Sequence, residues 1–201
     1  GLYVLTNSSS LVKSATTQPN IVLVFTDDQR GDTVSDVYMP KLASLASLGT
    51  TFTKAFVTTP LCCPSRSSIL TGQYAHNHGV LTNVPGFSAF NDSSTLATWL
   101  HDSGYKTALI GKYLNRYSPT STNPYIPPGW DWFQAFRGNP GYYSYSLTNY
   151  VNGVNGTSVS YGTKESDYST DVLAGKAVDF INATESNDAQ PFFLYFSCSS
   201  E

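Results

Sequence analysis

The chain contains short runs that are apolar at every position, and these runs predict the strands of a covered sheet. Residues 21–25 and 192–196 are continuously apolar, which is typical of strands buried on both faces of a parallel sheet. Residues 105–110 predict a further strand, and residues 51–57 are also β-prone.

Between these runs, apolar residues recur at helical spacing. Residues 40–48 begin with a proline and residues 95–103 contain three apolar side chains one turn apart; a glycine follows each segment. A third helix is expected over residues 171–181, and a fourth can open at Pro64. The alternation of strands and helices predicts an α/β fold with a mixed, largely parallel sheet flanked by helices.

Changes in local composition divide the chain. Residues 1–18 are rich in Ser and Thr without periodicity, so we expect an extended lead-in before a domain that occupies residues 19–201. Pro, Gly, Asn and Tyr dominate residues 124–163, where the pair Asn152-Gly153 favours a two-residue hairpin turn. We therefore expect an antiparallel insertion near the active face. The last strand is followed by only five residues, which predicts a sheet that is cut rather than finished.

Composition excludes several partners. The 201 residues are 40% hydrophobic and 12% charged, with a net charge of -3, and the apolar share is ample for a packed core. No basic stripe could neutralise a run of phosphates, so a nucleic-acid partner is not expected. The longest apolar run is far shorter than the ~20 residues that cross a bilayer, so no membrane span is expected.

Sequence features indicate a secretory-pathway glycoprotein, extracellular or in a lysosome-like or vacuole-like compartment. Asn-x-Ser/Thr acceptor sites occur at Asn7, Asn91, Asn155 and Asn182. The three cysteines are too few and too oddly spaced for a disulfide framework, which favours a chemical role for cysteine.

The sharpest chemical signal is the run CCPSRSSILTG at positions 62–72. It resembles the signature of the type I sulfatases, which fixes Cys, Pro, Ser, Arg, Thr and Gly at set offsets. A chance match at all six positions in a chain of this length is roughly a one-in-a-million event. If the helix opens at Pro64, Cys62 lies just before its N-terminus.

Other blocks in the same order extend the resemblance from about residue 19 to residue 196. They are QYAHNH at positions 73–78, GKYLN at 111–115, the Tyr-rich hairpin, and DYSTDVL at 167–173. Within the family, the chain is most similar to N-acetylglucosamine-6-sulfatases and to fungal and plant arylsulfatases. The resemblance implies the N-terminal part of the alkaline-phosphatase-like sulfatase domain and the hydrolysis of sulfuric esters.

The resemblance also implies a modified nucleophile. In this family the first Cys of the motif is oxidised to Cα-formylglycine, which assigns the modification, and a formylglycine-generating enzyme as partner, to Cys62. Cys63 occupies the variable position and is expected to stay a thiol. A hydrated aldehyde carries two hydroxyls on one carbon, so one hydroxyl can attack sulfur and the other can expel sulfate.

A cation is expected to support this chemistry, and Asp27 and Asp28 are its candidate ligands together with Cys62. Paired carboxylates at the carboxyl end of a buried strand lie where open α/β sheets bind ligands, and oxygen donors favour Ca²⁺ or Mg²⁺. The resemblance selects one Ca²⁺ ion. Arg66 follows Cys62 by four residues, about one helical turn, which predicts that its guanidinium is directed back toward Cys62 and stabilises the charge of the diol and the metal shell. The resemblance also implies that Lys112 contacts the sulfate.

Some expected parts of a sulfatase site have no counterpart in the sequence. In relatives a Pro-His element follows the strand that matches residues 192–196, and SCSSE at positions 197–201 stands in its place here. Leu114-Asn115 stands where several relatives have a substrate-contacting His. A truncated, non-catalytic fragment therefore remains an alternative. A phosphoester hydrolase of the same superfold is a further one, although its nucleophile is usually Ser or Thr.

The sequence leaves two interpretations open for the His76 and His78 pair, for the Tyr-rich stretch and for the substrate. His76 and His78 alternate like a zinc pair, but without acidic or Cys partners they are more typical of loop residues. Aromatic residues of the Tyr-rich stretch could stack on sugars or simply pack. The substrate, a small aryl sulfate ester or a sulfated sugar, is not decided by the sequence.

Overall fold

A computed structural model describes residues 18–119, 124–186 and 190–199. A mixed sheet forms its centre, with the strand order β1-β6-β2-β3-β4-β5. The strands β1, β6, β2 and β3 are parallel to one another. β4 pairs antiparallel with β3, and β5 pairs antiparallel with β4. The strands are β1 (Ile21–Asp27), β2 (Lys106–Gly111), β3 (Trp132–Phe136), β4 (Ser146–Val151), β5 (Val154–Ser160) and β6 (Phe192–Ser199). The predicted largely parallel α/β sheet is confirmed.

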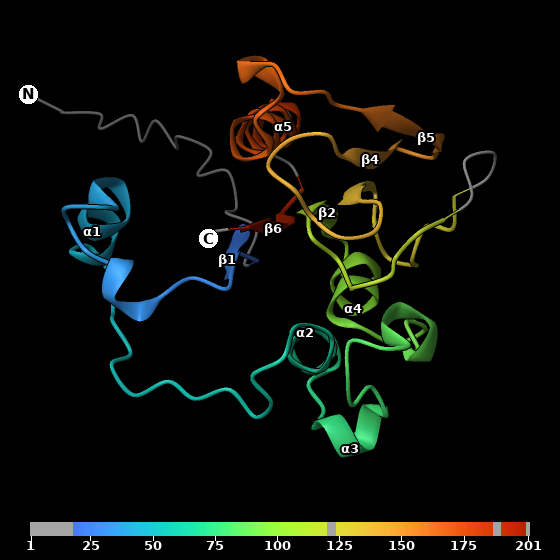
Figure 1. Cartoon of the computed structure of the whole chain (residues 1–201), viewed down its shortest axis with the longest axis horizontal. Coiled ribbons are helices and arrows are strands. Elements are labelled where there is room, and N and C mark those ends of the chain that lie inside the picture. Colours follow the sequence, from blue (N-terminus) through green and yellow to red (C-terminus); the bar gives the residue numbers. More distant parts are fainter. Residues whose placement is uncertain (1–17, 120–123, 187–189, 200–201) are drawn as a thin grey trace, which may run out of the picture.

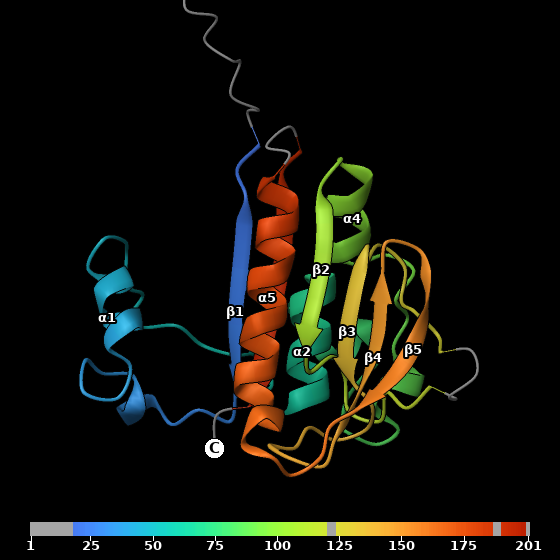
Figure 2. The ribbon, with the colours of Figure 1, turned by 90° about the horizontal axis from the view of Figure 1, so that it is seen from above.

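Helices cover both faces of this sheet, as Figures 1 and 2 show. The long helix α5 packs on one face, and α2 and α4 lie on the other. The helices are α1 (Pro40–Ala46), α2 (Cys62–Thr71), α3 (Ala75–His78), α4 (Leu96–Asp102) and α5 (Ser169–Glu185); short 3-10 turns occupy Gly31–Thr33, Gly86–Ala89 and Glu165–Asp167. Within the described residues, none of these helices is long and apolar enough to span a membrane.

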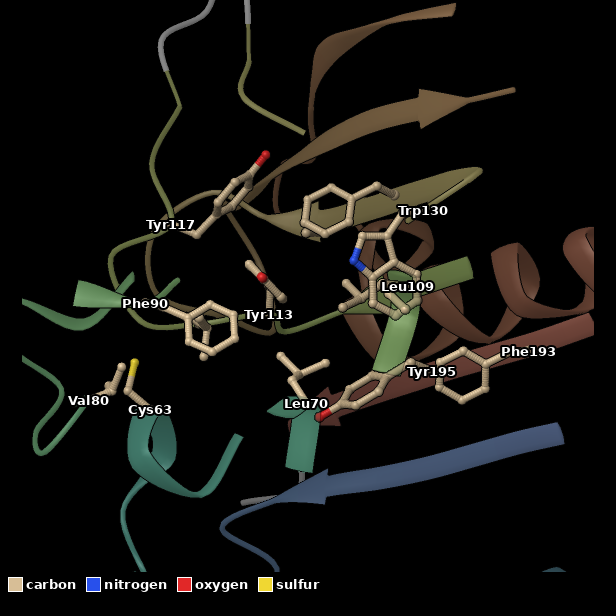
Figure 3. Packing of buried hydrophobic residues seen from close by; sticks show 14 of the residues in the cluster. Cys63, Leu70, Val80, Phe90, Leu109, Tyr113, Tyr117, Trp130, Phe193 and Tyr195 are labelled. Carbon is tan, nitrogen blue, oxygen red and sulfur yellow. The ribbon is translucent and has the colours of Figure 1, made fainter. Parts of the chain in front are cut away.

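The two-residue period of the central strands builds two hydrophobic cores. On β2, Leu109 faces α2 and α4, whereas Ala108 and Ile110 face α5. The same alternation on β6 sends Phe193 and Tyr195 into the first core (Figure 3). Fully burying one large apolar side chain stabilises a fold by roughly 1.5–3 kcal/mol. These strands are therefore rigid supports for whatever lies at their ends.

The prediction of two covered faces is right for β6 and wrong for β1. Val22 and Val24 are 50% and 60% exposed, because β1 is the edge strand and α5 lies over β2 and β6. β6 pairs with β1 on one side and with β2 on the other, so the last strand in sequence is central in space.

The β-prone segment at residues 51–57 forms no strand. Its aromatic side chains Phe52 and Phe56 are 80% and 90% exposed. β-Propensity reflects packing against a neighbouring strand, and these residues lie in the long connection between α1 and α2, away from the sheet (Figure 1). The predicted Asn152-Gly153 turn is confirmed, since it joins β4 to β5.

Candidate active site

The candidate site begins at the N-terminus of α2. Cys62 is the first residue of the helix, which starts two residues before the expected Pro64. The preceding Leu61 has no side-chain oxygen to cap the helix. Instead Asn83, twenty residues further on, accepts a hydrogen bond from the Cys63 N–H at 2.8 Å. This distant cap satisfies a donor that the first turn would otherwise leave unpaired, and it explains the earlier start.

Carboxylates from the end of β1 meet Cys62 at this helix terminus. One potential ligand atom from each of Asp27, Asp28 and Cys62 lies within 4.8 Å of the others. Asp27 is buried, whereas Asp28 is exposed and takes a left-handed backbone conformation with φ of 60°. Asp tolerates this conformation better than most residues, so the chain can turn sharply and aim both acids at one place.

Two cations hold the buried Asp27. Lys112 follows β2 directly, is 5% exposed, and donates from Nζ to Asp27 Oδ2. The Arg66 guanidinium is fully buried and lies 3.5 Å from Asp27 Oδ1. A buried carboxylate needs such partners because desolvation of an isolated charge is costly.

Arg66 also joins the ends of two strands. Its Nη1 donates to the Lys112 carbonyl at 2.7 Å and to Ser197 Oγ of β6 at 2.9 Å, and its guanidinium lies over the Phe25 ring at 4.9 Å. Sequence spacing predicts that Arg66 is directed back toward Cys62. In the structure Arg66 lines a cavity together with Cys62, and its hydrogen bonds go to Lys112 and Ser197. Arg66 therefore positions Asp27 and the backbone that carries Lys112.

Cys63 is buried and held by the segment that follows Lys112. The Asn115 N–H donates to its Sγ at 3.1 Å, and the thiol approaches Asn115 Oδ1 at 3.4 Å. Burial raises the pKa of Cys63, which favours the thiol over the thiolate. All three cysteines, each among the described residues, are free thiols. Cys63 therefore fixes α2 against the residues after β2.

Two cavities meet at Asp27, Asp28 and Cys62, because these three residues line both cavities. One has a volume of about 400 Å³ and includes apolar residues of the connection to α2, among them Val57, Pro60 and Leu61. The other has a volume of about 360 Å³ and is lined in addition by Lys112, Asn115, Asn139, Pro140, Gly141 and Tyr142. The site is thus open on an apolar side and on a polar side.

The two histidines of α3 lie outside both cavities. His76 is exposed and stacks on Tyr74 with ring centroids 5.7 Å apart. His78 contacts Ser68 Oγ through Nε2 at 3.0 Å, and its Nδ1 accepts from the Val80 N–H at 3.1 Å. These contacts favour the structural interpretation over a zinc pair.

Because the folded protein favours the neutral form of His78, its free energy of unfolding is expected to fall at low pH. Partial burial, the largest cause, lowers its pKa below the usual 6.5. The unfolded ring therefore takes up a proton before the folded one, so stability that is fully present above about pH 6.5 is lost as the pH falls from that value through the lower pKa of the folded protein. We expect His78→Asn, which keeps an acceptor for Val80, to weaken this loss between pH 7 and 5. Urea unfolding at both pH values measures it, and parallel losses in the two proteins would contradict the prediction.

The glycosylation candidates lie in different settings. Asn91 and Asn182 are exposed, the former in a turn where its Oδ1 accepts from the Ser93 N–H and the latter within α5. Asn155 belongs to β5, and its side chain lies outside the described part, as does Asn7 altogether.

Several residues at the site are not singled out by any local pattern. Asn83 and Ser197 reach the site only through tertiary contacts, and Asn139 and Tyr142 do so from the connection between β3 and β4. The run of Pro, Gly and Asn around position 140 indicates a loop. Because β3 is parallel to β2, that loop emerges at the same edge of the sheet as Lys112.

The sequence matches a known family. The sulfatase family model covers residues 19–200, so the chain belongs to the sulfatase family. It is 38% identical over 188 residues to the extracellular sulfatase SULF-1 homolog of Drosophila melanogaster, covering 90% of this chain and 16% of that protein. It is 36% identical over 197 residues to the N-acetylglucosamine-6-sulfatase of Homo sapiens, covering 91% of this chain and 34% of that protein. The chain thus spans about a third or less of the length of these relatives.

The fold agrees with the family assignment. One solved structure, of a protein in complex with its substrate D-glucosamine-2-N,6-O-disulfate, superimposes with a TM-score of 0.70 at 27% identity. The match covers 89% of this chain and 34% of that one. The predicted resemblance to the N-terminal portion of the sulfatase fold is confirmed.

Proposed function

We propose that residues 19–201 carry the N-terminal part of a sulfate ester hydrolase site in which Cys62 becomes the nucleophile. The observation that carries this proposal is the convergence of Asp27, Asp28 and Cys62 within 4.8 Å, with Lys112 bound to Asp27. The nucleophile stands at the start of a ten-residue helix. A helix N-terminus favours negative charge, and the charge of sulfate would be stabilised there.

The donor set fits a calcium ion once Cys62 is modified. Carboxylates are hard oxygen ligands that suit Ca²⁺, whereas a thiolate prefers softer metals. Conversion of Cys62 to formylglycine replaces sulfur by oxygen and makes all three donors alike. Because Ca²⁺ takes six to eight oxygens, further donors must complete its shell. When bound, the ion would withdraw charge from the sulfate oxygens and favour an ionised hydroxyl at position 62.

The surrounding residues have distinct roles in this proposal. Lys112 lines the polar cavity beside Cys62, where its ammonium would neutralise charge that develops on the sulfate. Arg66 acts through Asp27, which it holds at 3.5 Å, and is a positioning residue. Asp27 and Asp28 would hold the metal. Cys63 stays a thiol, held by Asn115.

Partners and compartment follow from the same proposal. The substrate is a small sulfate ester or a sulfated sugar, and a formylglycine-generating enzyme modifies Cys62. Because that modification belongs to secretion, we place the protein in the secretory pathway, as an extracellular or lysosome-like glycoprotein. The names of the relatives, an extracellular sulfatase and an N-acetylglucosamine-6-sulfatase, support this placement.

Mass spectrometry of the peptide that contains Cys62 tests the proposal. For protein secreted from a eukaryotic host, we expect a mass lower by roughly 18 Da, since CH₂SH is replaced by CHO. The variant Cys63→Ser should keep this loss, and Cys62→Ala should abolish it. An unmodified Cys62 in a host that converts other sulfatases would overturn the proposal and leave the non-catalytic alternative.

A further inference from the structure

The connection between β3 and β4 forms one wall of the polar cavity. Asn139 and Tyr142 line the cavity from this loop, and Asn115 lines it from the segment after β2. Cys62 and Lys112 line it as well. A sulfate ester bound between the nucleophile and the lysine can therefore place its alcohol portion against these residues.

The loop is held on both sides of the residues that line the cavity. Before Asn139, the Gly138 N–H donates to the Tyr117 carbonyl at 2.7 Å. After it, the Tyr142 carbonyl accepts from the Ser169 N–H at 2.9 Å, at the start of α5. The Tyr142 ring also stacks on Tyr168, with centroids 5.6 Å apart and an interplanar angle of 23°. The wall is consequently built in advance of binding, which lowers the entropic cost of recognition.

Asn115 is fixed on its own side of the cavity. Its backbone N–H donates to Cys63 Sγ at 3.1 Å, and its carbonyl accepts from the Phe87 N–H at 3.0 Å. Gly86 makes this second contact possible, because a Cβ there would lie 2.5 Å from the Asn115 carbonyl oxygen. Asn115 is thus held in place relative to Cys62 through the neighbouring cysteine.

We propose that this polar cavity is a subsite for a hydroxyl-rich leaving alcohol, and that Asn115, Asn139 and Tyr142 determine specificity for sugar sulfates over aryl sulfates. The proposal rests on the sulfatase function proposed above. An amide donates and accepts at once, as a sugar hydroxyl requires. A plain aromatic ring would desolvate both amides without pairing them, which a polar site penalises. The volume of about 360 Å³ is within the range of small-molecule sites.

Binding of two probe molecules tests the subsite without requiring turnover. Saturation-transfer NMR titrations give the Kd of glucosamine 6-sulfate and of phenyl sulfate for the secreted chain and for Asn139→Ala. Asn139 is exposed, so the variant should keep its fold. We expect its Kd for the sugar to rise about tenfold and its Kd for phenyl sulfate to change less than twofold. Asn77→Ala, an exposed asparagine that lines neither cavity, is the matched control and should change neither.

The outcomes separate this subsite from the enzymatic function. Equal weakening of both probes, or a sugar that binds Asn139→Ala as well as the parent, overturns the subsite. Asn139-dependent sugar binding by a chain whose Cys62 is never converted supports the subsite and overturns the proposed catalysis. Conversion of Cys62 together with tighter binding of phenyl sulfate than of the sugar supports the proposed catalysis and overturns the subsite.

Discussion

Under the proposed sulfatase function, replacing Cys62 by serine is expected to stop multiple turnover of sulfate esters and to trap sulfate on the protein. The serine hydroxyl can attack sulfur, so that a new S–O bond forms while the bond to the alcohol breaks and the alcohol takes the proton. Serine has no second hydroxyl on that carbon to expel the sulfate. We expect turnover to fall at least about 10³-fold, as for other nucleophile substitutions, and the Cys62 peptide to gain about 80 Da, the mass of SO₃.

Intact-mass analysis after incubation with glucosamine 6-sulfate measures the adduct, and sulfate release measures turnover. Cys62→Ala should give neither adduct nor turnover, because it lacks any hydroxyl. Cys63→Ser should behave as the parent in both assays if the replacement hydroxyl still pairs with Asn115. Turnover by the Cys62→Ser protein at the parental rate would show that no paired hydroxyls are needed, and the proposed chemistry would fail.

The substitution Gly111→Ala is expected to destabilise the fold more than other single changes at the strand ends. Gly111 ends β2 with φ of 113°, a conformation that L side chains rarely adopt. A Cβ there would lie 1.8 Å from the Ser197 carbonyl oxygen of β6. That oxygen also accepts from the Lys112 N–H at 2.9 Å, so relief of the clash must separate the two central strands beside the site.

We expect a loss of at least about 4 kcal/mol in the free energy of unfolding, which for a chain of this size corresponds to a Tm lower by about 8–16 °C. Circular dichroism melts of the variant measure this loss. Gly175→Ala is the matched control, since Gly175 lies exposed in α5 with nothing within 4 Å of its added Cβ. It should stabilise by about 0.5–1 kcal/mol. Equal melting temperatures for the two variants would contradict the close approach at Gly111.

Several features could be predicted because they depend on neighbouring residues alone. Continuous apolar runs predicted β1 and β6, helical spacing predicted α1, α4 and α5, and the Asn152-Gly153 pair predicted the β4–β5 turn. The motif at positions 62–72 identified the family, which the family comparison confirms. It also singled out Cys62 and Arg66, whose roles remain predictions.

Other features depend on residues far apart in the chain. Asp27 and Lys112 are 85 residues apart and meet because parallel strands bring their carboxyl ends to one edge of the sheet. No local pattern encodes the cap that Asn83 gives to α2, or the wall that Asn139 gives to the polar cavity. Strand order likewise decides that Val22 and Val24 on β1 are exposed.

The sequence by itself therefore determined the class of fold, the family and the identity of the candidate nucleophile, because periodicity and a contiguous motif are local properties. The tertiary structure decided which charges surround Asp27 and which side chains line each cavity. It did so because burial forces distant charges to pair, and because the order of strands in the sheet chooses which loops share an edge.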